Sequence, residues 1–421
     1  MKFLRNIDQE QFDAFAIDCL YNHYSKTSYY GKWKKQEGFT YHLCGVEKDG
    51  KLVATALLQH KKMSFPYGSY CYVSYGYNMD YLDKELLNFI NQSVIEFSRE
   101  MKVTFLRIDP NVPRLEHQKD GKIKEQGFNN EIVTSQLETI GFKHLGYNYG
   151  YSGNWLSRYT YVLDLSPELP AIFKGIKRES IYHKKNILRD LRVEEVGRAG
   201  LQTLYEGELL LAKQQGFIPK PLAYFEEMYD AFEPFVHVYV ASSNLSKAYT
   251  NVKEEIVHLQ EELQNTSEEK TGKRNELIAS ISSLEKELGK MEEEGYDKKG
   301  ETPLGAKLII QMKDKVWNVN MYTFKILPNF RVAFALHRKA IEECKKRDAK
   351  SYNFEGISGS LDPKDRYYGL FDFKRSFGGD FIEYLGEFDY VFKPKQYQFY
   401  RKYSPIPLRI KKKLYQWKKG R

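Results

Sequence analysis

The sequence has few cysteines and no long hydrophobic run, and each shortage excludes a class of protein. Its four cysteines, Cys19, Cys44, Cys71 and Cys344, form no Cys-x-x-Cys pair and have no histidine at metal-ligand spacing. We therefore expect reduced, buried thiols and no structural zinc. No stretch approaches the roughly 18 uncharged residues that a membrane-spanning helix needs, and the first residues, MKFLRNIDQEQ, contain no apolar run of the signal-peptide kind. We expect the protein to stay in the cytoplasm.

Motifs for several kinds of chemistry are also missing. The nine histidines are scattered, and none pairs with a carboxylate or cysteine at metal-site spacing, so we predict no metal. No R/Q-x-x-G-x-G/A loop lies between a strand and a helix, which argues against an acetyltransferase that cradles a pyrophosphate cofactor. No G-x-S-x-G turn occurs either, so we do not expect a serine nucleophile.

Positive charge and aromatic residues are abundant. The 421 residues carry a formal net charge of +9, and 15% of them are aromatic, including 33 tyrosines. Such a charge favours polyanionic partners: nucleic acid, phosphorylated substrates or an anionic lipid surface. The final segment, RIKKKLYQWKKGR, has seven basic residues and no acidic one. It is either a solvated helical tail or a segment that rests on tRNA phosphates or anionic headgroups.

Two parts of the chain share one order of predicted elements. Between about Thr40 and Tyr77, alternating hydrophobic residues predict a three-stranded meander; a helix around Leu86 to Phe97 and the strand TFLRI, which ends at Asp109, follow. Later, AKLIIQMKD and KVWNVNMYTF predict a hairpin, FALHRKAIEECKK a helix and SYNFEGI a strand. Because the chain is too long for one ordinary core, we predict an α/β protein of two related units, each a twisted mixed sheet with packed helices.

A segment of different composition runs from about Asn244 to Tyr296. It is rich in Glu and Lys, lacks proline, and has apolar residues at heptad spacing in two blocks, 252–263 and 277–291. The polar stretch NTSEEKTGKRN between the blocks breaks the register, which predicts an antiparallel helical hairpin that projects as an arm. The arm either mediates dimerisation, is a simple insertion, or supports a large extended ligand such as tRNA.

Four segments resemble, in family order, the Fem/Mur (FemABX) family of peptidoglycan bridge aminoacyltransferases. They are KTSYYGKWKKQEGFTYHLCGV near the N-terminus, FLRIDP at 105–110, SYNFEGISG at 351–359 and DFKRSFGGDFIEYLGEFDYVFKP at 372–394. The predicted arm lies where the FemA, FemB, MurM and MurN branch carries one. The resemblance implies two GNAT-like domains with an inserted antiparallel coiled-coil arm. The expected division is 1–160 for the first domain, 161–243 and 298–395 for the two parts of the second, 244–297 for the arm and 396–421 for a basic tail.

The resemblance also implies a reaction. A tRNA-dependent aminoacyltransferase would add Gly, Ala or Ser to the stem-peptide lysine or interpeptide bridge of a peptidoglycan precursor. Aminoacyl-tRNA would be the donor, without a cofactor, and lipid II or a UDP-linked muramyl peptide the acceptor. A lipid-linked acceptor would bring the protein to the inner face of the membrane, in peripheral contact with anionic lipid. An amine that attacks an ester needs a proton acceptor and a group that stabilises the oxyanion.

Three residues are assigned to this chemistry. Asp109 ends an apolar strand, where the edge of a sheet often faces a cleft, although Asp-Pro is also a common turn starter. The resemblance implies that Asp109 lines the cleft as a proton acceptor or as a ligand of the attacking amine. Lys374, in FKRSFGG, matches a family lysine that would neutralise the tRNA terminus or the developing oxyanion, and Phe373 would pack beside it.

Five further residues are expected to bind substrate. Lys34 matches the family lysine that contacts the phosphates of nucleotide-linked precursors, although the aromatic residue four positions earlier is tyrosine where the family usually has tryptophan. In HKKNILRDLR, Lys185 and Arg189 match a basic stretch of further phosphate ligands. Tyr322 and Asn353 are expected in the cleft, although an aromatic residue in a strand is also typical of a core.

Two other functions are compatible with parts of the sequence. A tRNA-binding or coiled-coil interaction protein without catalysis would share the positive charge and the arm. An aminoacyl-tRNA–protein transferase would share the fold and the donor but would modify protein N-termini. The arm and the FKRSFGG segment argue against this second alternative.

Overall fold

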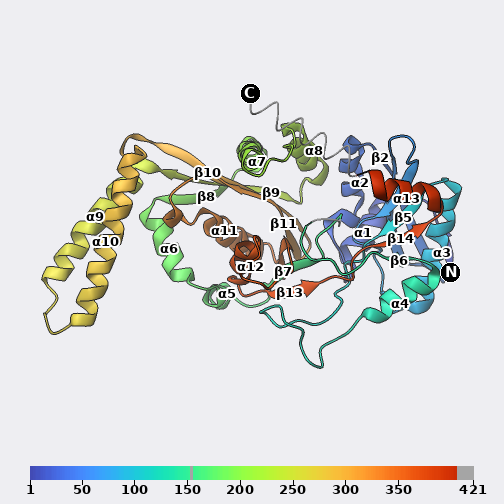
Figure 1. Cartoon of the computed structure of the whole chain (residues 1–421), viewed down its shortest axis with the longest axis horizontal. Helices are drawn as coiled ribbons and strands as arrows, with labels where there is room; N and C mark the ends of the chain where they lie inside the picture. Colours follow the sequence, from blue (N-terminus) through green and yellow to red (C-terminus); the bar gives the residue numbers. More distant parts are fainter. Residues whose placement is uncertain (152–154, 405–421) are drawn as a thin grey trace.

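The computed structural model describes residues 1–151 and 155–404. Two seven-stranded sheets and a helical hairpin follow one another along the long axis of the molecule, with the hairpin at one end and the N-terminal sheet at the other (Figure 1). This arrangement confirms the predicted α/β fold of two GNAT-like domains with an inserted helical arm. The predicted basic segment RIKKKLYQWKKGR lies outside the described residues.

The first sheet has the strand order β1-β2-β3-β4-β5-β14-β6. Its strands are β1 (Lys2–Leu4), β2 (Phe39–Lys48), β3 (Lys51–Lys62), β4 (Ser69–Val73), β5 (Phe105–Ile108), β14 (Phe388–Val391) and β6 (Lys143–His144). The expected meander is confirmed as the antiparallel strands β2 to β4, and β4 then pairs with β5 in parallel. The helices of this domain are α1 (Gln9–Asp18), α2 (Ser28–Lys34), α3 (Lys84–Glu100), α4 (Glu131–Ile140) and α13 (Pro394–Tyr403).

The second sheet, followed from its other edge, has the order β8-β9-β10-β11-β12-β7-β13. Its strands are β8 (Leu191–Glu195), β9 (Val236–Asn244), β10 (Glu301–Met312), β11 (Lys315–Thr323), β12 (Ser351–Ile357), β7 (Tyr159–Asp164) and β13 (Asp380–Glu383). Its helices are α5 (Leu169–Gly175), α6 (Glu179–Leu188), α7 (Leu201–Gln215), α8 (Leu222–Phe232), α11 (Val332–Lys346) and α12 (Tyr368–Arg375). Its pairings repeat those of the first sheet, with one parallel pair, β11–β12, in the place of β4–β5.

The two sheets exchange strands. β6 belongs to the first sheet but the next strand, β7, belongs to the second; β13 and β14 cross back the other way. The predicted second-domain segment 298–395 is therefore wrong at its end, because β14 completes the first sheet. The physical reason is Arg107 on β5, whose buried guanidinium donates two hydrogen bonds of 2.7 Å to Asp389 and one of 3.0 Å to Glu387. These acidic residues are buried and need that cation beside them.

The arm consists of α9 (Leu245–Gln264) and α10 (Thr271–Glu293). Heptad residues of both helices, among them Val252, Ile256, Leu277 and Ile281, are buried, which confirms the predicted hairpin. Figure 1 shows that it projects from the far end of the second sheet. No helix in the described parts of the chain is long and apolar enough to cross a membrane.

Aromatic residues join the two domains. Tyr24, which follows α1, contacts both Phe232 of α8 and Trp317 of β11, with ring centroids 5.8 Å apart in each case. Trp33 of α2 packs edge-on against Tyr224 of α8 at 5.0 Å. The N-terminal helices therefore pack on the second domain as well as on their own sheet, and polar groups between the domains are shielded from water.

Candidate active site

Lys374 lies on α12 and is almost fully buried, with 7% exposure. Its Nζ donates hydrogen bonds to the backbone oxygens of Glu355 (2.7 Å) and Gly356 (2.8 Å) at the end of β12. Burial lowers the pKa of Lys374 to about 8, because the charged ammonium loses its hydration. Two of the three N–H groups of the ammonium are occupied, so one remains to bind another oxygen atom.

Asp109 lies directly after β5 and is 6% exposed. One carboxylate oxygen accepts a hydrogen bond from the Tyr72 hydroxyl and the other from the Tyr75 backbone N–H, both at 2.7 Å. Burial raises the pKa of Asp109 well above its usual range, and the nearby Glu387 adds to the effect, although the two hydrogen bonds oppose it. A small cavity beside this carboxyl is also lined by Tyr75, Tyr384 and Arg158.

A histidine connects the surroundings of these two residues. The ring of His23 stacks on Tyr75 with centroids 3.7 Å apart, and its Nε2 lies 3.3 Å from a carboxylate oxygen of Glu355. His23 Nδ1 accepts the backbone N–H of Ser25 at 3.2 Å, so the proton belongs on Nε2, where it is donated to Glu355. The path from Asp109 to Lys374 thus runs through Tyr75, His23 and Glu355 and crosses from one domain to the other.

Asn353 fixes the shape of β12 at this point. Its Oδ1 accepts hydrogen bonds from the Thr160 hydroxyl at 2.5 Å and from the backbone N–H of Glu355 at 2.7 Å. Glu355 has a left-handed backbone, with φ of 59°, as does Tyr75, with φ of 56°. Non-glycine residues adopt this conformation at a cost, and they concentrate at functional sites. Asn353 therefore positions the carbonyl groups that hold Lys374.

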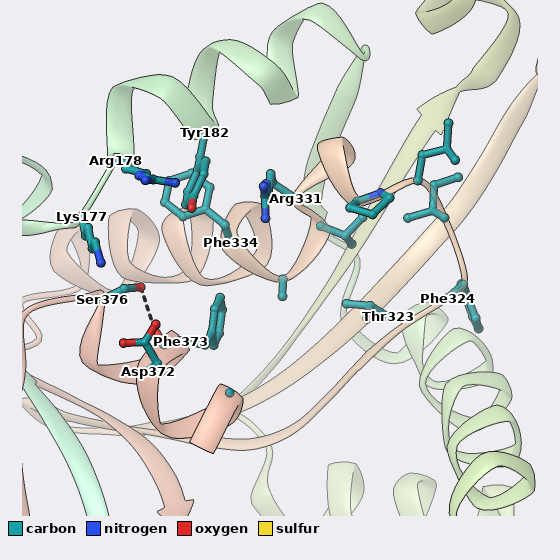
Figure 2. A pocket seen from close by; sticks show the side chains of 16 residues that line it. Lys177, Arg178, Tyr182, Thr323, Phe324, Arg331, Phe334, Asp372, Phe373 and Ser376 are labelled. Atoms are coloured by element: carbon teal, nitrogen blue, oxygen red, sulfur yellow. Dashed lines mark hydrogen bonds between the residues drawn. The ribbon is translucent and has the colours of Figure 1, made fainter. Parts of the chain in front are cut away.

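Phe373, next to Lys374, lines a cavity of about 550 Å³ in the second domain. Figure 2 shows the cavity between α6, α11 and α12, with Lys177, Arg178 and Arg331 on its walls. Arg331 precedes the first residue of α11, and the buried Nε of its guanidinium has no hydrogen-bond partner within the described structure. A helix N-terminus surrounded by cations attracts anions.

Lys34 and Tyr322 lie in a second polar group between the domains. Lys34, the last residue of α2, pairs with Glu37 at 2.6 Å and lies 4.9 Å above the Trp33 ring. Burial lowers the pKa of Lys34, and Glu37 partly opposes this shift. The Tyr322 hydroxyl donates to Glu208 at 2.7 Å. Both acidic residues contact Lys220. Glu37 lies 3.8 Å from the Lys220 ammonium, and Glu208 accepts the Lys220 backbone N–H at 2.9 Å.

The structure separates Lys185 and Arg189 from these groups. Arg189 is 1% exposed, and its guanidinium donates to both carboxylate oxygens of Glu287 on α10, at 2.7 and 2.5 Å. This corrects the predicted phosphate ligand, because a buried, doubly paired guanidinium fixes the arm to the domain and cannot reach a substrate. Lys185 donates to Asn329 at 2.9 Å beside the same contact; its role as a phosphate ligand stays a prediction.

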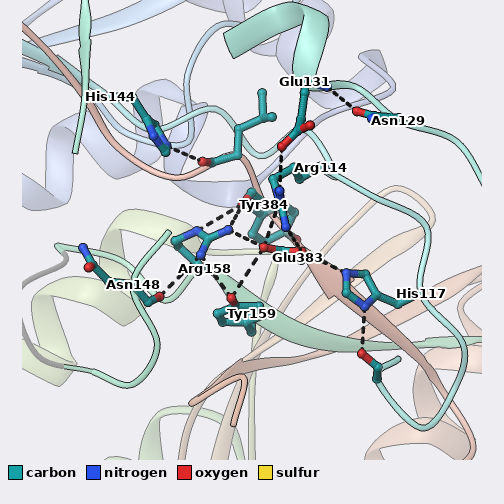
Figure 3. Close-up of polar contacts among 12 residues, drawn as sticks. Arg114, His117, Asn129, Glu131, His144, Asn148, Arg158, Tyr159, Glu383 and Tyr384 are labelled. Atoms are coloured by element: carbon teal, nitrogen blue, oxygen red, sulfur yellow. Dashed lines mark hydrogen bonds and ion pairs between the residues drawn. The ribbon is translucent and has the colours of Figure 1, made fainter. Parts of the chain in front are cut away.

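A cluster of charged residues, drawn in Figure 3, includes Arg158, which lines the small cavity beside Asp109. Glu383, at the end of β13, accepts hydrogen bonds from Arg114 (2.9 Å) and Arg158 (2.5 Å), and lies 2.9 Å from His117. Burial alone would raise the pKa of Glu383, but hydrogen bonds from His117 and Arg114 lower it to about 2. The backbone oxygen of Tyr384 accepts from Arg158, so this cluster holds the crossing strand beside Asp109.

The structure brings the predicted residues Asp109, Lys374 and Asn353 into one chain of contacts, with Phe373 beside Lys374; their roles stay predictions, and sequence reasoning missed the residues that join them. No sequence pattern marked His23, because a single histidine in a polar loop belongs to no motif. Glu355 stands inside the segment SYNFEGISG, so the signal was present but was not assigned to a residue. Within the described ranges, no group of three or more His, Cys, Asp or Glu is placed to hold a metal ion.

The fold and the site define a class: a two-domain, GNAT-like α/β protein with a helical arm, in which contacts between the domains link a buried carboxyl to a buried lysine. The chain belongs to the FemAB family, whose model matches residues 7–404.

Named relatives and a solved structure agree with this assignment. A protein named Lipid II:glycine glycyltransferase from Staphylococcus saprophyticus is 25% identical, covering 97% of this chain and 98% of that protein. One of the same name from Staphylococcus aureus is 26% identical over 97% of each chain. The crystal structure of FemX is similar in fold, with a TM-score of 0.73 and 23% identity, covering 95% of this chain and 99% of that one.

Proposed function

We propose that this protein is an aminoacyltransferase that moves Gly, Ala or Ser from aminoacyl-tRNA to a peptidoglycan precursor. The acceptor is the amine of the stem-peptide lysine or of an interpeptide bridge, on lipid II or on a UDP-linked muramyl peptide. The names of the staphylococcal relatives favour glycine and lipid II. No cofactor takes part in the proposed reaction.

One observation carries the proposal. A chain of contacts joins Asp109 of the first domain to Lys374 of the second: the Tyr75 backbone N–H donates to Asp109, and the Tyr75 ring stacks on His23. His23 in turn bonds the Glu355 carboxylate, and Lys374 donates to the Glu355 backbone oxygen. Their pKa values are shifted in opposite senses by the same burial: that of Asp109 is raised and that of Lys374 is lowered to about 8. Amine attack on an ester requires two groups: a carboxylate that accepts a proton and a protonated lysine that stabilises the oxyanion.

The donor end of tRNA fits the cavity in the second domain. Its three cations and the start of α11 match the terminal phosphates, and its aromatic walls, including Phe373 and Phe334, match a terminal base. Phe373 and Lys374 are consecutive on α12. The proposal therefore requires the ester carbonyl to pass from the Phe373 side of α12 to the free N–H of the Lys374 ammonium.

The acceptor fits the polar group around Lys34. The ammonium of Lys34 is surrounded by rings and by Glu37, and together with the nearby ammonium groups of Lys61 and Lys220 it would meet the diphosphate. The stem peptide then extends between the domains toward Asp109, past Tyr30 and Tyr72, which are both buried.

The transfer itself needs no covalent enzyme intermediate. The acceptor amine attacks the ester carbonyl carbon, and the Lys374 ammonium stabilises the negative charge on the carbonyl oxygen. Asp109 accepts the proton that the amine loses. The C–O bond to the tRNA ribose then breaks, the ribose oxygen takes up the proton, and an amide remains.

Purified protein incubated with tRNA charged with radiolabelled Gly, Ala or Ser, and with lipid II or UDP-linked muramyl pentapeptide, tests the proposal. Label in the precursor is the expected result. Transfer only to a protein N-terminus would indicate the aminoacyl-tRNA–protein transferase. Retention of charged tRNA without any transfer would leave a tRNA-binding protein.

A further inference from the structure

The turn between β3 and β4 carries a solvent-exposed phenylalanine. Phe65 is 97% exposed, the highest value among the exposed large hydrophobic residues of the described chain. The turn is closed by Tyr67 N–H donating to the Ser64 oxygen (2.9 Å) and by Met63 N–H donating to the Gly68 oxygen (2.7 Å). Phe65 is therefore held outward by backbone hydrogen bonds at the tip of the hairpin.

Helix α13 lies beside this turn and extends the aromatic surface. The Tyr67 ring is 5.8 Å from that of Phe399, which is 43% exposed, and the Phe399 ring is 4.5 Å from that of Tyr403. Gln396 of α13 donates a hydrogen bond to the Pro66 oxygen. The turn and the helix thus form one surface, which we name the Phe65 surface: residues 61–68 and 393–403.

The Phe65 surface carries positive charge only. Its basic residues are Lys61, Lys62, Lys393, Lys395, Arg401 and Lys402, and neither segment contains Asp or Glu. The exposed aromatic tip with a ring of cations is the combination by which peripheral proteins bind anionic bilayers: the rings enter the interface and the cations meet the headgroups.

We propose that the Phe65 surface docks on an anionic phospholipid bilayer, with the Phe65 ring inserted among the headgroups. The surface is continuous with the Lys34 site, since the ammonium of Lys61 lies 4.4 Å and that of Lys34 5.6 Å from the same Phe39 ring. This step rests on the proposed function: a precursor with its diphosphate at Lys34 has its lipid chain directed to the Phe65 surface. The proposed donor cavity lies in the other domain, so RNA has no comparable reason to cover Phe65.

Flotation of the full-length protein with vesicles tests the docking. Vesicles of phosphatidylcholine with about 30% phosphatidylglycerol, which gives the bilayer a negative surface charge, are compared with vesicles of phosphatidylcholine alone. Phe65→Ser and the double variant Lys62→Glu, Lys395→Glu are compared with matched controls elsewhere on the first domain, Leu82→Ser and the double variant Lys84→Glu, Lys143→Glu. Leu82 is 60% exposed, so both hydrophobic replacements remove an exposed side chain.

The expected result is binding to the anionic vesicles that falls about fivefold or more in each Phe65-surface variant and in neither control. In Phe65→Trp, the added tryptophan emission should shift to the blue with anionic vesicles and be quenched by brominated lipid. Unchanged flotation of Phe65→Ser, or no shift in Phe65→Trp, overturns the proposal. So does a loss of tRNA binding by the charge variant with normal flotation. The vesicles contain neither donor nor acceptor, so the outcome does not depend on whether transfer occurs.

Discussion

The two sheets have the same strand order and pairing, yet they differ at the helix that follows the hairpin. In the first domain, α3 begins after Asp83, whose carboxylate accepts the Leu86 N–H at 3.0 Å and so caps the helix from within. Buried Tyr77 and Tyr81 fill the loop before it. The Asp83 carboxylate therefore satisfies one N–H of this helix end and places a negative charge there.

The second domain leaves the equivalent position open. α11 begins after Arg331, which has a left-handed backbone and no side-chain cap, and a cavity of about 550 Å³ lies before it. The comparison shows that two domains with the same strand order present different chemical groups at equivalent positions. The second domain has an uncapped, basic helix end, which we propose binds an anion, whereas the first caps that end and has the buried carboxyl of Asp109 at the end of β5.

The largest effect is expected where the sheets exchange strands. Arg107→Met removes the cation that pairs with Asp389 of β14 and with Glu387 just before it, and it leaves two buried acidic residues without a compensating positive charge. We expect a loss of about 3–5 kcal/mol in the free energy of unfolding, measured by urea denaturation. The second sheet holds its crossing strand without this arginine, so the first domain should unfold before the second.

Arg5→Met is the matched control for this prediction. Arg5 also pairs with an acidic residue of the first domain, Glu100, at 2.6 Å, but both side chains are about half exposed. Such pairs contribute about 0–1 kcal/mol. A similar small loss in Arg107→Met would contradict the role given to the buried network in fixing β14.

Lys374→Met tests the second domain's contribution to catalysis. Methionine fills a similar volume but carries no charge, so the oxyanion loses its stabilising group. We expect transfer to slow by about 10²- to 10³-fold with a much smaller change in Tm, measured by single-turnover transfer and by thermal melting. Lys339→Met, which breaks only a surface pair with Glu343 on α11, serves as control. Normal turnover in the Lys374 variant would remove this residue from the mechanism.

Asp109→Asn tests the first domain's contribution, with a loss of about 10²-fold expected. In the native protein the reactive carboxylate forms only as pH rises through the raised pKa of Asp109. The Lys374 ammonium is lost as pH rises through its pKa of about 8. kcat/KM should therefore rise with pH and then fall. The asparagine variant should lose the rising limb and keep the falling one; an unaltered rising limb would assign the proton acceptor to another group.

The sequence predicted the parts of this molecule that depend on local periodicity. The alternation in β2 to β4, the helical spacing of Leu86 and Val94 in α3, and the heptads of the arm each reflect which face of an element is buried. Asp109 and Lys374 could be singled out because a strand end and a glycine-flanked segment mark them locally; the roles that the family resemblance gives them stay predictions.

The remaining features depend on contacts between residues far apart in the chain. Nothing in the pattern FDYV tells which of two sheets it joins, because Arg107 lies 282 positions from Asp389. The same reasoning applies to Arg189, whose partner Glu287 is 98 positions away on the arm. The sequence pattern around a basic residue in a helix is the same whether its side chain binds a phosphate or a buried carboxylate. Only the folded structure distinguishes these two roles.

The smallest effect is expected at the two helix starts that distinguish the domains. Arg331→Gln, at the open start of α11, removes one cation from the proposed donor cavity. It should raise the KM for aminoacyl-tRNA about tenfold, leave kcat nearly unchanged, and reduce the slope of log affinity against log salt by about one. Lys84→Gln removes a cation from the closed start of α3 and should change neither quantity. Equal effects of the two variants would show that the tRNA follows the general positive charge of the protein, and the contrast between an open and a closed helix end would then have no bearing on donor binding.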